Sequence, residues 1–79
     1  MPHLHIQHFP RDLTAQETER LSHALTTAIL DTFDTTHGAV SISLEPVAKP
    51  DWNDTVLPSI VARHEQQQLI KTPAYWRKG

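Results

Sequence analysis

The sequence predicts an α+β fold: a βαβ unit, two parallel strands joined by a long helix, followed by a C-terminal helix. Two observations predict it. Residues 3–9 and 39–45 each alternate between side chains of opposite character, as strands do. Between them, apolar residues recur at helical spacing over about twenty positions, and a strand–helix–strand connection of that length makes the two strands parallel.

The first strand covers residues 3–9. Its alternate side chains face opposite sides of the sheet: Leu4, Ile6 and His8 on one face, and His3, His5, Gln7 and Phe9 on the other. Pro10 ends this strand, because proline has no backbone N–H to donate. The second strand, residues 39–45, has the same character: Val40, Ile42 and Leu44 on one face, and Ala39, Ser41, Ser43 and Glu45 on the other.

The long helix covers residues 14–35. Thr14 and Glu17 form a Thr-x-x-Glu capping box at its start. Its apolar stripe consists of Leu21, Ala24, Leu25, Ala28, Ile29, Leu30 and Phe33. Gly38 is expected to end the helix, since glycine adopts the left-handed conformation freely.

A short helical turn at residues 51–57 and a second helix follow. Pro58 suits the first turn of that helix, where its missing N–H costs nothing. The helix is expected to end with Leu69 and Ile70, before Pro73. We expect Tyr75 and Trp76, in the tail, to pack on a partner chain.

The chain is expected to be a single domain, residues 1–79, that forms a homodimer. It has 79 residues and no cysteine, and a domain of this size buries only about 60 % of the surface of its unfolded chain. A two-stranded sheet is not stable alone in water. We therefore expect two copies to complete a four-stranded sheet with the helices on one face.

Composition excludes several partners. Nine acidic and seven basic residues give a net charge of −2, which argues against nucleic acid, because a phosphate-binding surface needs a basic excess. No apolar run is long enough to span a membrane, and the N-terminus does not resemble a signal peptide. We therefore expect a soluble, cytoplasmic protein. His3 and His5 share a strand face without a third ligand, so a metal site is not expected. No other cofactor is expected either.

Pro2 is the first candidate for chemistry. If Met1 is removed, Pro2 carries a secondary amine at the N-terminus. An α-amine has an ordinary pKa of about 7.7–8.0, and an apolar pocket lowers that value by desolvation. A neutral, rigidly held amine is a good general base at pH 7, and can also attack carbonyl groups.

Several segments together resemble one enzyme family. They are the N-terminal Met-Pro-His-Leu-His-Ile, the following Phe-Pro-Arg, the βαβ order, the alternating serines of the second strand, and Leu-Ile-Lys-x-Pro-x-Tyr near the C-terminus. The chain is similar to the 4-oxalocrotonate tautomerase family, and within it to the short bacterial members. This resemblance covers nearly the whole chain and implies the tautomerase fold. It also implies that Pro2 is the general acid/base of a keto–enol tautomerisation.

The resemblance implies roles for three further residues, and at two of them this sequence departs from the family pattern. Arg11 corresponds to a carboxylate-binding arginine, although it stands one residue closer to the proline than the family pattern asks. Ser41 replaces a second arginine and supplies one hydrogen bond but no charge. Trp52 corresponds to an aromatic wall around the amine. A singly charged 2-keto acid such as phenylpyruvate therefore suits the site better than a doubly charged substrate.

Two other functions stay open. One is a hydratase or dehalogenase of unsaturated acids, which needs a water-activating carboxylate near the amine. Glu45 is a candidate, although the position of its strand face relative to the amine is unassigned. The other is a non-catalytic oligomeric binding protein that retains the fold. A serine nucleophile is not expected, because no acid is placed to orient Ser41 and a histidine. The long C-terminal segment favours a dimer over a trimer of dimers.

Overall fold

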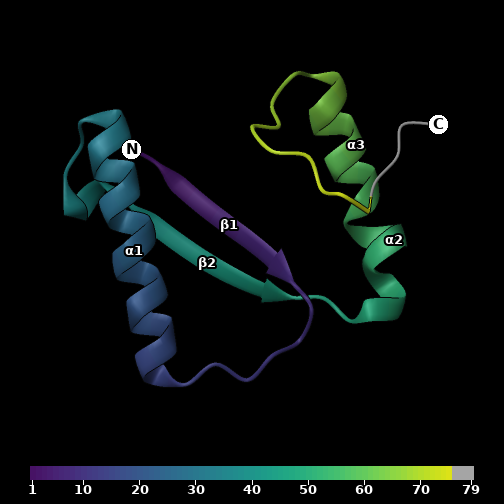
Figure 1. Ribbon diagram of the computed structural model, residues 1–79, viewed down its shortest axis with the longest axis horizontal. Helices are drawn as coiled ribbons and strands as arrows, with labels where there is room; N and C mark the ends of the chain where they lie inside the picture. Colours follow the sequence, from purple (N-terminus) through teal and green to yellow (C-terminus); the bar gives the residue numbers. More distant parts are fainter. Residues whose placement is uncertain (76–79) are drawn as a thin grey trace. The chain divides into compact units, whose positions relative to one another are not determined.

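The structure, a computed structural model, describes residues 1–75 (Figure 1). The chain divides into two compact units, Met1–Ala48 and the segment from Lys49 onward. The expectation of a single domain over residues 1–79 stays a prediction.

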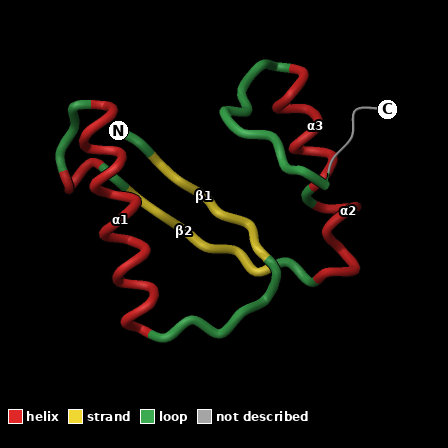
Figure 2. The backbone as a smooth tube through the Cα atoms, in the orientation of Figure 1, coloured by secondary structure: helices red, strands yellow, loops and turns green. Residues whose placement is uncertain are grey.

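The first unit is a βαβ unit. Strand β1 (His3–His8) is followed by helix α1 (Ala15–Phe33), a 3₁₀ turn at His37–Ala39 and strand β2 (Ser41–Pro46). The two strands are parallel neighbours in one sheet. Helix α1 lies alongside the sheet and runs in the opposite direction to both strands (Figures 1 and 2). The predicted α+β fold with two parallel strands is therefore confirmed.

The strand register separates an apolar face from a polar face. The apolar face is built from Leu4 paired with Ile42 and Ile6 paired with Leu44. The polar face is built from three pairs: His3 with Ser41, His5 with Ser43, and Gln7 with Glu45. Leu21 and Ser22 of α1 line one small pocket together with Ile42 and Leu44, so α1 covers the apolar face, as the alternation in the sequence requires.

The start of α1 has the predicted capping box. The Glu17 N–H donates to Thr14 Oγ1 at 3.0 Å, and the Thr14 N–H donates to Glu17 Oε1 at 3.0 Å. The predicted helix end was wrong. Asp34, with φ of 53°, takes the left-handed conformation, and its N–H donates to the Leu30 carbonyl at 3.2 Å. Gly38 has no positive φ and lies in the 3₁₀ turn instead.

The second unit is helical. A 3₁₀ turn at Lys49–Asp51 leads into α2 (Trp52–Thr55) and then α3 (Leu57–Glu65). Pro58 occupies the first turn of α3, as predicted. The C-terminal limit at Ile70 was wrong, because α3 ends at Glu65.

A left-handed residue ends α3. Gln67 has φ of 59°. The Gln67 N–H donates to the His64 carbonyl at 2.9 Å, and the Gln68 N–H donates to the Arg63 carbonyl at 2.8 Å. These two bonds form a Schellman motif, which satisfies carbonyls at the helix end and turns the chain away.

Little of the described chain is fully buried. Among residues 1–75, the buried apolar side chains are Val47, 6 % exposed, and Val56, 3 % exposed. The apolar residues between α1 and the sheet remain partly exposed. Such incomplete burial of apolar side chains is expected of a chain whose sheet is completed by a second copy. The dimer itself stays a prediction. None of the helices in this part of the chain has the length and apolar character needed to cross a membrane.

Candidate functional site

Pro2 lies directly before β1, at the end of the sheet where both strands begin. The Ser41 N–H donates to the Pro2 carbonyl at 3.2 Å, so the first residue of β2 holds Pro2 in place. Pro2 is partly buried. Figure 1 shows that the C-terminal end of α1 lies beside this N-terminal segment, because a crossover helix that returns the chain to a parallel strand must end where both strands start.

A pocket of about 390 Å³ lies at this end of the first unit. Its lining is mainly apolar and consists of Met1, Pro2, His3, Leu4, Ile29 and Phe33. Ile29 and Phe33 are four residues apart and therefore share one face of α1. Helical periodicity in the sequence placed both residues in the apolar stripe, and neither was predicted to be a site residue. Phe33 remains 62 % exposed, which distinguishes it from a core residue.

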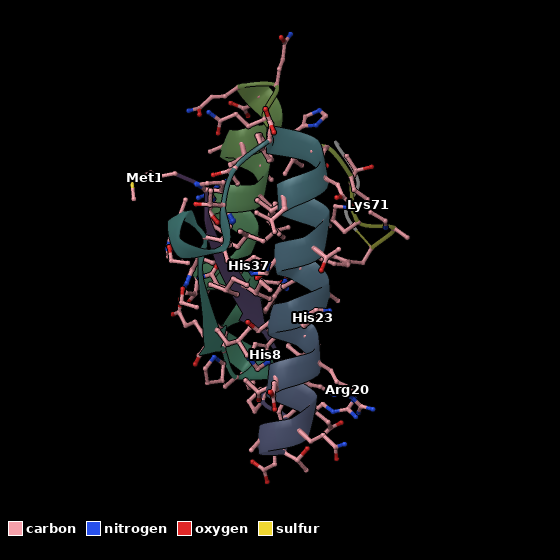
Figure 3. All side chains as sticks on the ribbon, turned by 90° about the vertical axis from the view of Figure 1, so that its left-hand side faces the viewer. Met1, His8, Arg20, His23, His37 and Lys71 are labelled. Atoms are coloured by element: carbon pink, nitrogen blue, oxygen red, sulfur yellow. The ribbon has the colours of Figure 1, made fainter. Side chains whose placement is uncertain are left out.

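Met1 determines the chemical state of Pro2. Its side chain projects away from the ribbon (Figure 3) and is fully exposed. While Met1 is attached, the Pro2 nitrogen is part of a tertiary amide and has no basic lone pair. Removal of Met1 would convert this nitrogen into a secondary amine that lines the pocket.

Ser41 is brought to the Pro2 end of the sheet, as its predicted role requires. Its hydroxyl lies 2.6 Å from His3 Nδ1. This pair belongs to the polar face, opposite α1. The Pro2 end therefore has an apolar side, formed by α1, and a polar side, formed by His3 and Ser41.

A longer hydrogen-bonded chain follows on the polar face. His5 Nδ1 lies 2.5 Å from Ser43 Oγ, and His5 Nε2 lies 2.7 Å from Glu45 Oε1. The His5 hydrogen bond holds the pKa of the Glu45 carboxyl below its usual value of 4.5; desolvation opposes this shift, and a hydrogen bond from Gln7 adds to it. Sequence patterns placed Ser43 and Glu45 on one face of β2, but that face was not matched to the face of β1 that carries His5, and no acid was assigned to Ser41. The spacing of Ser43 and Glu45 on one strand could have placed both on the face of His5.

Glu45 is not at the Pro2 end of its own chain. It stands four residues along β2 from Ser41, which corresponds to about 13 Å at the usual rise of a strand. The water-activating carboxylate that a hydratase or dehalogenase needs is therefore not supplied to Pro2 by Glu45 of the same chain.

Arg11 also lies away from Pro2 of the same chain. It follows β1, and the six residues of that strand separate its two ends by about 17 Å. Its side chain is 74 % exposed, and Arg11 Nη2 lies 3.9 Å from Glu17 Oε2. The structure thus places Arg11 and Pro2 at opposite ends of β1.

Trp52 lies in the second unit, at the start of α2. Its side chain is partly buried, and Nε1 donates to the Tyr75 hydroxyl at 3.0 Å. This bond joins α2 to the segment that follows α3. The predicted packing of Tyr75 and Trp76 on a partner stays a prediction for Tyr75, and Trp76 lies outside the described residues.

Metal ligands do not cluster in the part of the chain that the structure describes. Among residues 1–75, no three His, Asp or Glu side chains come together in a way that could hold a metal ion. His5 is hydrogen-bonded at both ring nitrogens, to Ser43 and Glu45.

No protein-family model matches the chain. Individual proteins do match. Tautomerase PptA of Klebsiella pneumoniae (strain 342) is 36 % identical over 75 residues, which cover 95 % of this chain and 97 % of that protein. The chain belongs to the PptA-type tautomerase family. Tautomerase PptA of Enterobacter sp. (strain 638) is 32 % identical, and that of Pectobacterium atrosepticum 28 % identical, each over the same shares of both chains.

The family accounts for the architecture described above. Two parallel strands joined by α1 fit the βαβ tautomerase fold, and the resemblance seen in the sequence is confirmed. Relatives that are named tautomerases over 95 % of the chain support a tautomerase, and hence an isomerase, acting on small molecules.

Proposed function

We propose that the protein is a keto–enol tautomerase for a small, singly charged 2-keto acid such as phenylpyruvate, with the Pro2 amine as the general acid/base. The observation that carries this proposal is the position of Pro2, which is tied to Ser41 and lines a largely apolar pocket. The family relationship supports the same reaction class.

The proposed reaction moves one proton between two atoms of the substrate. In ketonisation, the protonated amine donates a proton to C3 of the enol while the enol hydroxyl gives its proton to a solvent water molecule, which can return a proton to the amine. The amine is then reprotonated, and the reverse direction uses the neutral amine as the base. The apolar lining favours the neutral amine by desolvation, so both forms are accessible near pH 7.

We propose Ser41 and Trp52 as further contacts of the substrate. Ser41 is tied to Pro2 through its backbone N–H, and its hydroxyl can donate one hydrogen bond to a keto or carboxylate oxygen. Trp52, carried by the second unit, is proposed as an apolar wall that keeps water from the amine. Neither residue adds a positive charge.

Arg11 is proposed as the carboxylate anchor, supplied by a second copy. A two-fold axis perpendicular to the sheet makes neighbouring β1 edges antiparallel and keeps both α1 helices on one face. That pairing would bring the Arg11 end of one β1 toward the Pro2 end of the other. The proposed homodimer therefore completes both the four-stranded sheet and the site.

Replacement of Pro2 tests the assignment of the base. We expect Pro2→Ala to lower the rate of phenylpyruvate enol ketonisation by about 10²-fold, the usual scale for a positioned acid/base. Pro10→Ala, at the other end of β1, is the matched control and should retain activity. Intact mass should show loss of Met1 in active protein. Equal rates for native protein and Pro2→Ala would remove Pro2 from the mechanism.

A second outcome would change the class of function. If the processed protein ketonises no enol and its Pro2 amine titrates as an ordinary α-amine does, the non-catalytic binding protein is favoured over the tautomerase.

A further inference from the structure

We propose that Ile29 and Phe33 are specificity-determining residues that hold the aryl group of the substrate beside Pro2. This inference rests on the proposed tautomerase function and adds a binding surface from α1. It assigns to these two residues of the first unit a role separate from that proposed for Trp52.

The size and lining of the pocket fit an aromatic ring. Its volume is about 390 Å³, and Pro2, Leu4, Ile29 and Phe33 give it apolar walls. An apolar cavity of about 150 Å³ in another protein is large enough to bind benzene. The pocket beside Pro2 therefore has room for a phenyl group together with the carbon that gains or loses the proton.

Phe33 exposes apolar surface to water, and covering that surface is energetically favourable. The side chain is 62 % exposed, although it faces the same pocket as Pro2. Ile29, one helical turn earlier, is partly buried and forms the adjoining wall. A substrate ring placed against Phe33 removes apolar surface from water on both sides, and aromatic pairs are favourable beyond the area that they bury.

The end of α1 fixes the position of this surface. Phe33 is the last residue of the helix, and Asp34 turns the chain with a left-handed φ of 53°. The Asp34 N–H donates to the Leu30 carbonyl, so the Phe33 backbone is held on both sides. The aromatic side chain thus starts from a defined point next to β1.

The same helix end disfavours a carboxylate. The C-terminal end of a helix carries a partial negative charge, and Asp34 adds a full one. The last turn of α1 contains no basic residue to offset these charges. An anionic 2-keto acid is therefore expected to place its apolar group, and not its carboxylate, toward α1.

Two substrates of equal charge test the proposal. Phenylpyruvate carries a ring, and 2-ketobutyrate does not; both exchange their C3 protons with deuterium when they are tautomerised. We expect Phe33→Ala to lower kcat/KM about tenfold for phenylpyruvate, mainly through KM, and to change it less than about twofold for 2-ketobutyrate. The tenfold loss equals about 1.4 kcal/mol, which is the scale of an aromatic contact. For phenylpyruvate, kcat/KM of Phe33→Leu should lie between the values of the native protein and of Phe33→Ala.

Phe9→Ala is the matched control. Phe9 is also an exposed phenylalanine, at 44 %, but it follows the far end of β1. Its replacement should leave the ratio of kcat/KM for phenylpyruvate to kcat/KM for 2-ketobutyrate unchanged. Binding of 3-phenylpropionate, which has the ring and carboxylate but no keto group, should weaken in Phe33→Ala and stay the same in Phe9→Ala when it is measured by calorimetry.

Three results would overturn the proposal. One is an equal fall in kcat/KM for both substrates in Phe33→Ala, and another is an unchanged kcat/KM for both. The third is dissociation of the oligomer in Phe33→Ala by sedimentation with an unchanged substrate ratio, which would assign Phe33 to a subunit interface. Pro2→Ala separates these results from failure of the proposed function, because it should slow exchange of both substrates by about 10²-fold whether or not Phe33 contacts the ring.

Discussion

If Arg11 acts on the substrate at Pro2, it must come from a second copy of the chain. Within one chain the two residues lie at opposite ends of β1, about 17 Å apart along the strand. That separation is about twice the distance over which charges remain unscreened at physiological ionic strength. An arginine on the same chain would therefore contribute almost nothing to binding of a carboxylate beside Pro2.

Mixing two impaired variants tests this arrangement. In Arg11→Ala, loss of a hydrogen bond to a charged group costs about 1.5–3 kcal/mol, so kcat/KM should fall roughly 10- to 150-fold. Pro2→Ala should also be impaired in its own homodimers. When equal amounts are unfolded and refolded together, half of the dimers are mixed, and each mixed dimer has one site with both native residues. Activity should then recover to about a quarter of that of the native protein.

The controls separate complementation from stability. Circular dichroism should show that Arg11→Ala remains folded, since its exposed pair with Glu17, at 3.9 Å, contributes little. Mixing without unfolding should recover activity only as fast as subunits exchange. If the activity of the refolded mixture equals the average activity of the two variants, the proposal that two copies share the site is wrong. Native activity in Arg11→Ala alone would remove Arg11 from the site altogether.

Two further predictions concern the first unit. Thr14→Ala removes the hydroxyl that accepts from the Glu17 N–H and should lower the free energy of unfolding by about 1 kcal/mol, measured in urea. Glu45 has a lowered pKa in the folded chain, so its contribution to stability should be complete above pH 4.5 and should be lost as the pH falls through the folded pKa. When the pH is lowered from 7 to 3, the midpoint of thermal unfolding should therefore fall less in Glu45→Gln than in the native chain. Equal falls in the midpoint would show that the hydrogen bond between Glu45 and His5 does not affect stability.

Local sequence signals predicted the beginnings of elements better than their ends. Alternation gave the faces of both strands, because side chains on a strand have no other periodicity. The capping box gave the start of α1, because Thr14 and Glu17 satisfy backbone groups that only a helix start leaves open. Both signals lie within a few residues of the structure that they specify.

The helix ends were missed because the residues that turn the chain are ordinary ones. Asp34 and Gln67 adopt positive φ, while the glycine nearest to the end of α1 does not. A left-handed aspartate or glutamine is less favourable than a glycine, and nothing in the local sequence requires it. Ile70 continued the apolar pattern of α3 but lies beyond the turn at Gln67 and is fully exposed.

The candidate site was predicted only in part, for a geometric reason. Pro2 and Ser41 could be paired because they precede and begin parallel strands. Phe33 could not be assigned to the site from periodicity, since an apolar position near a helix end looks the same whether it faces a core or a pocket. The role proposed for Phe33 depends on the placement of α1 against the sheet, which the local sequence does not show.

The two proposals together fix the direction in which a substrate would lie. Phe33 and Ile29 offer an apolar surface at a helix end that repels anions. Arg11 of a second copy would approach across the β1 edge. A 2-keto acid would then extend from its ring at α1 to its carboxylate at the partner strand, with C3 between them beside the Pro2 nitrogen. In that orientation, ring and carboxylate would hold both reacting atoms within reach of the amine.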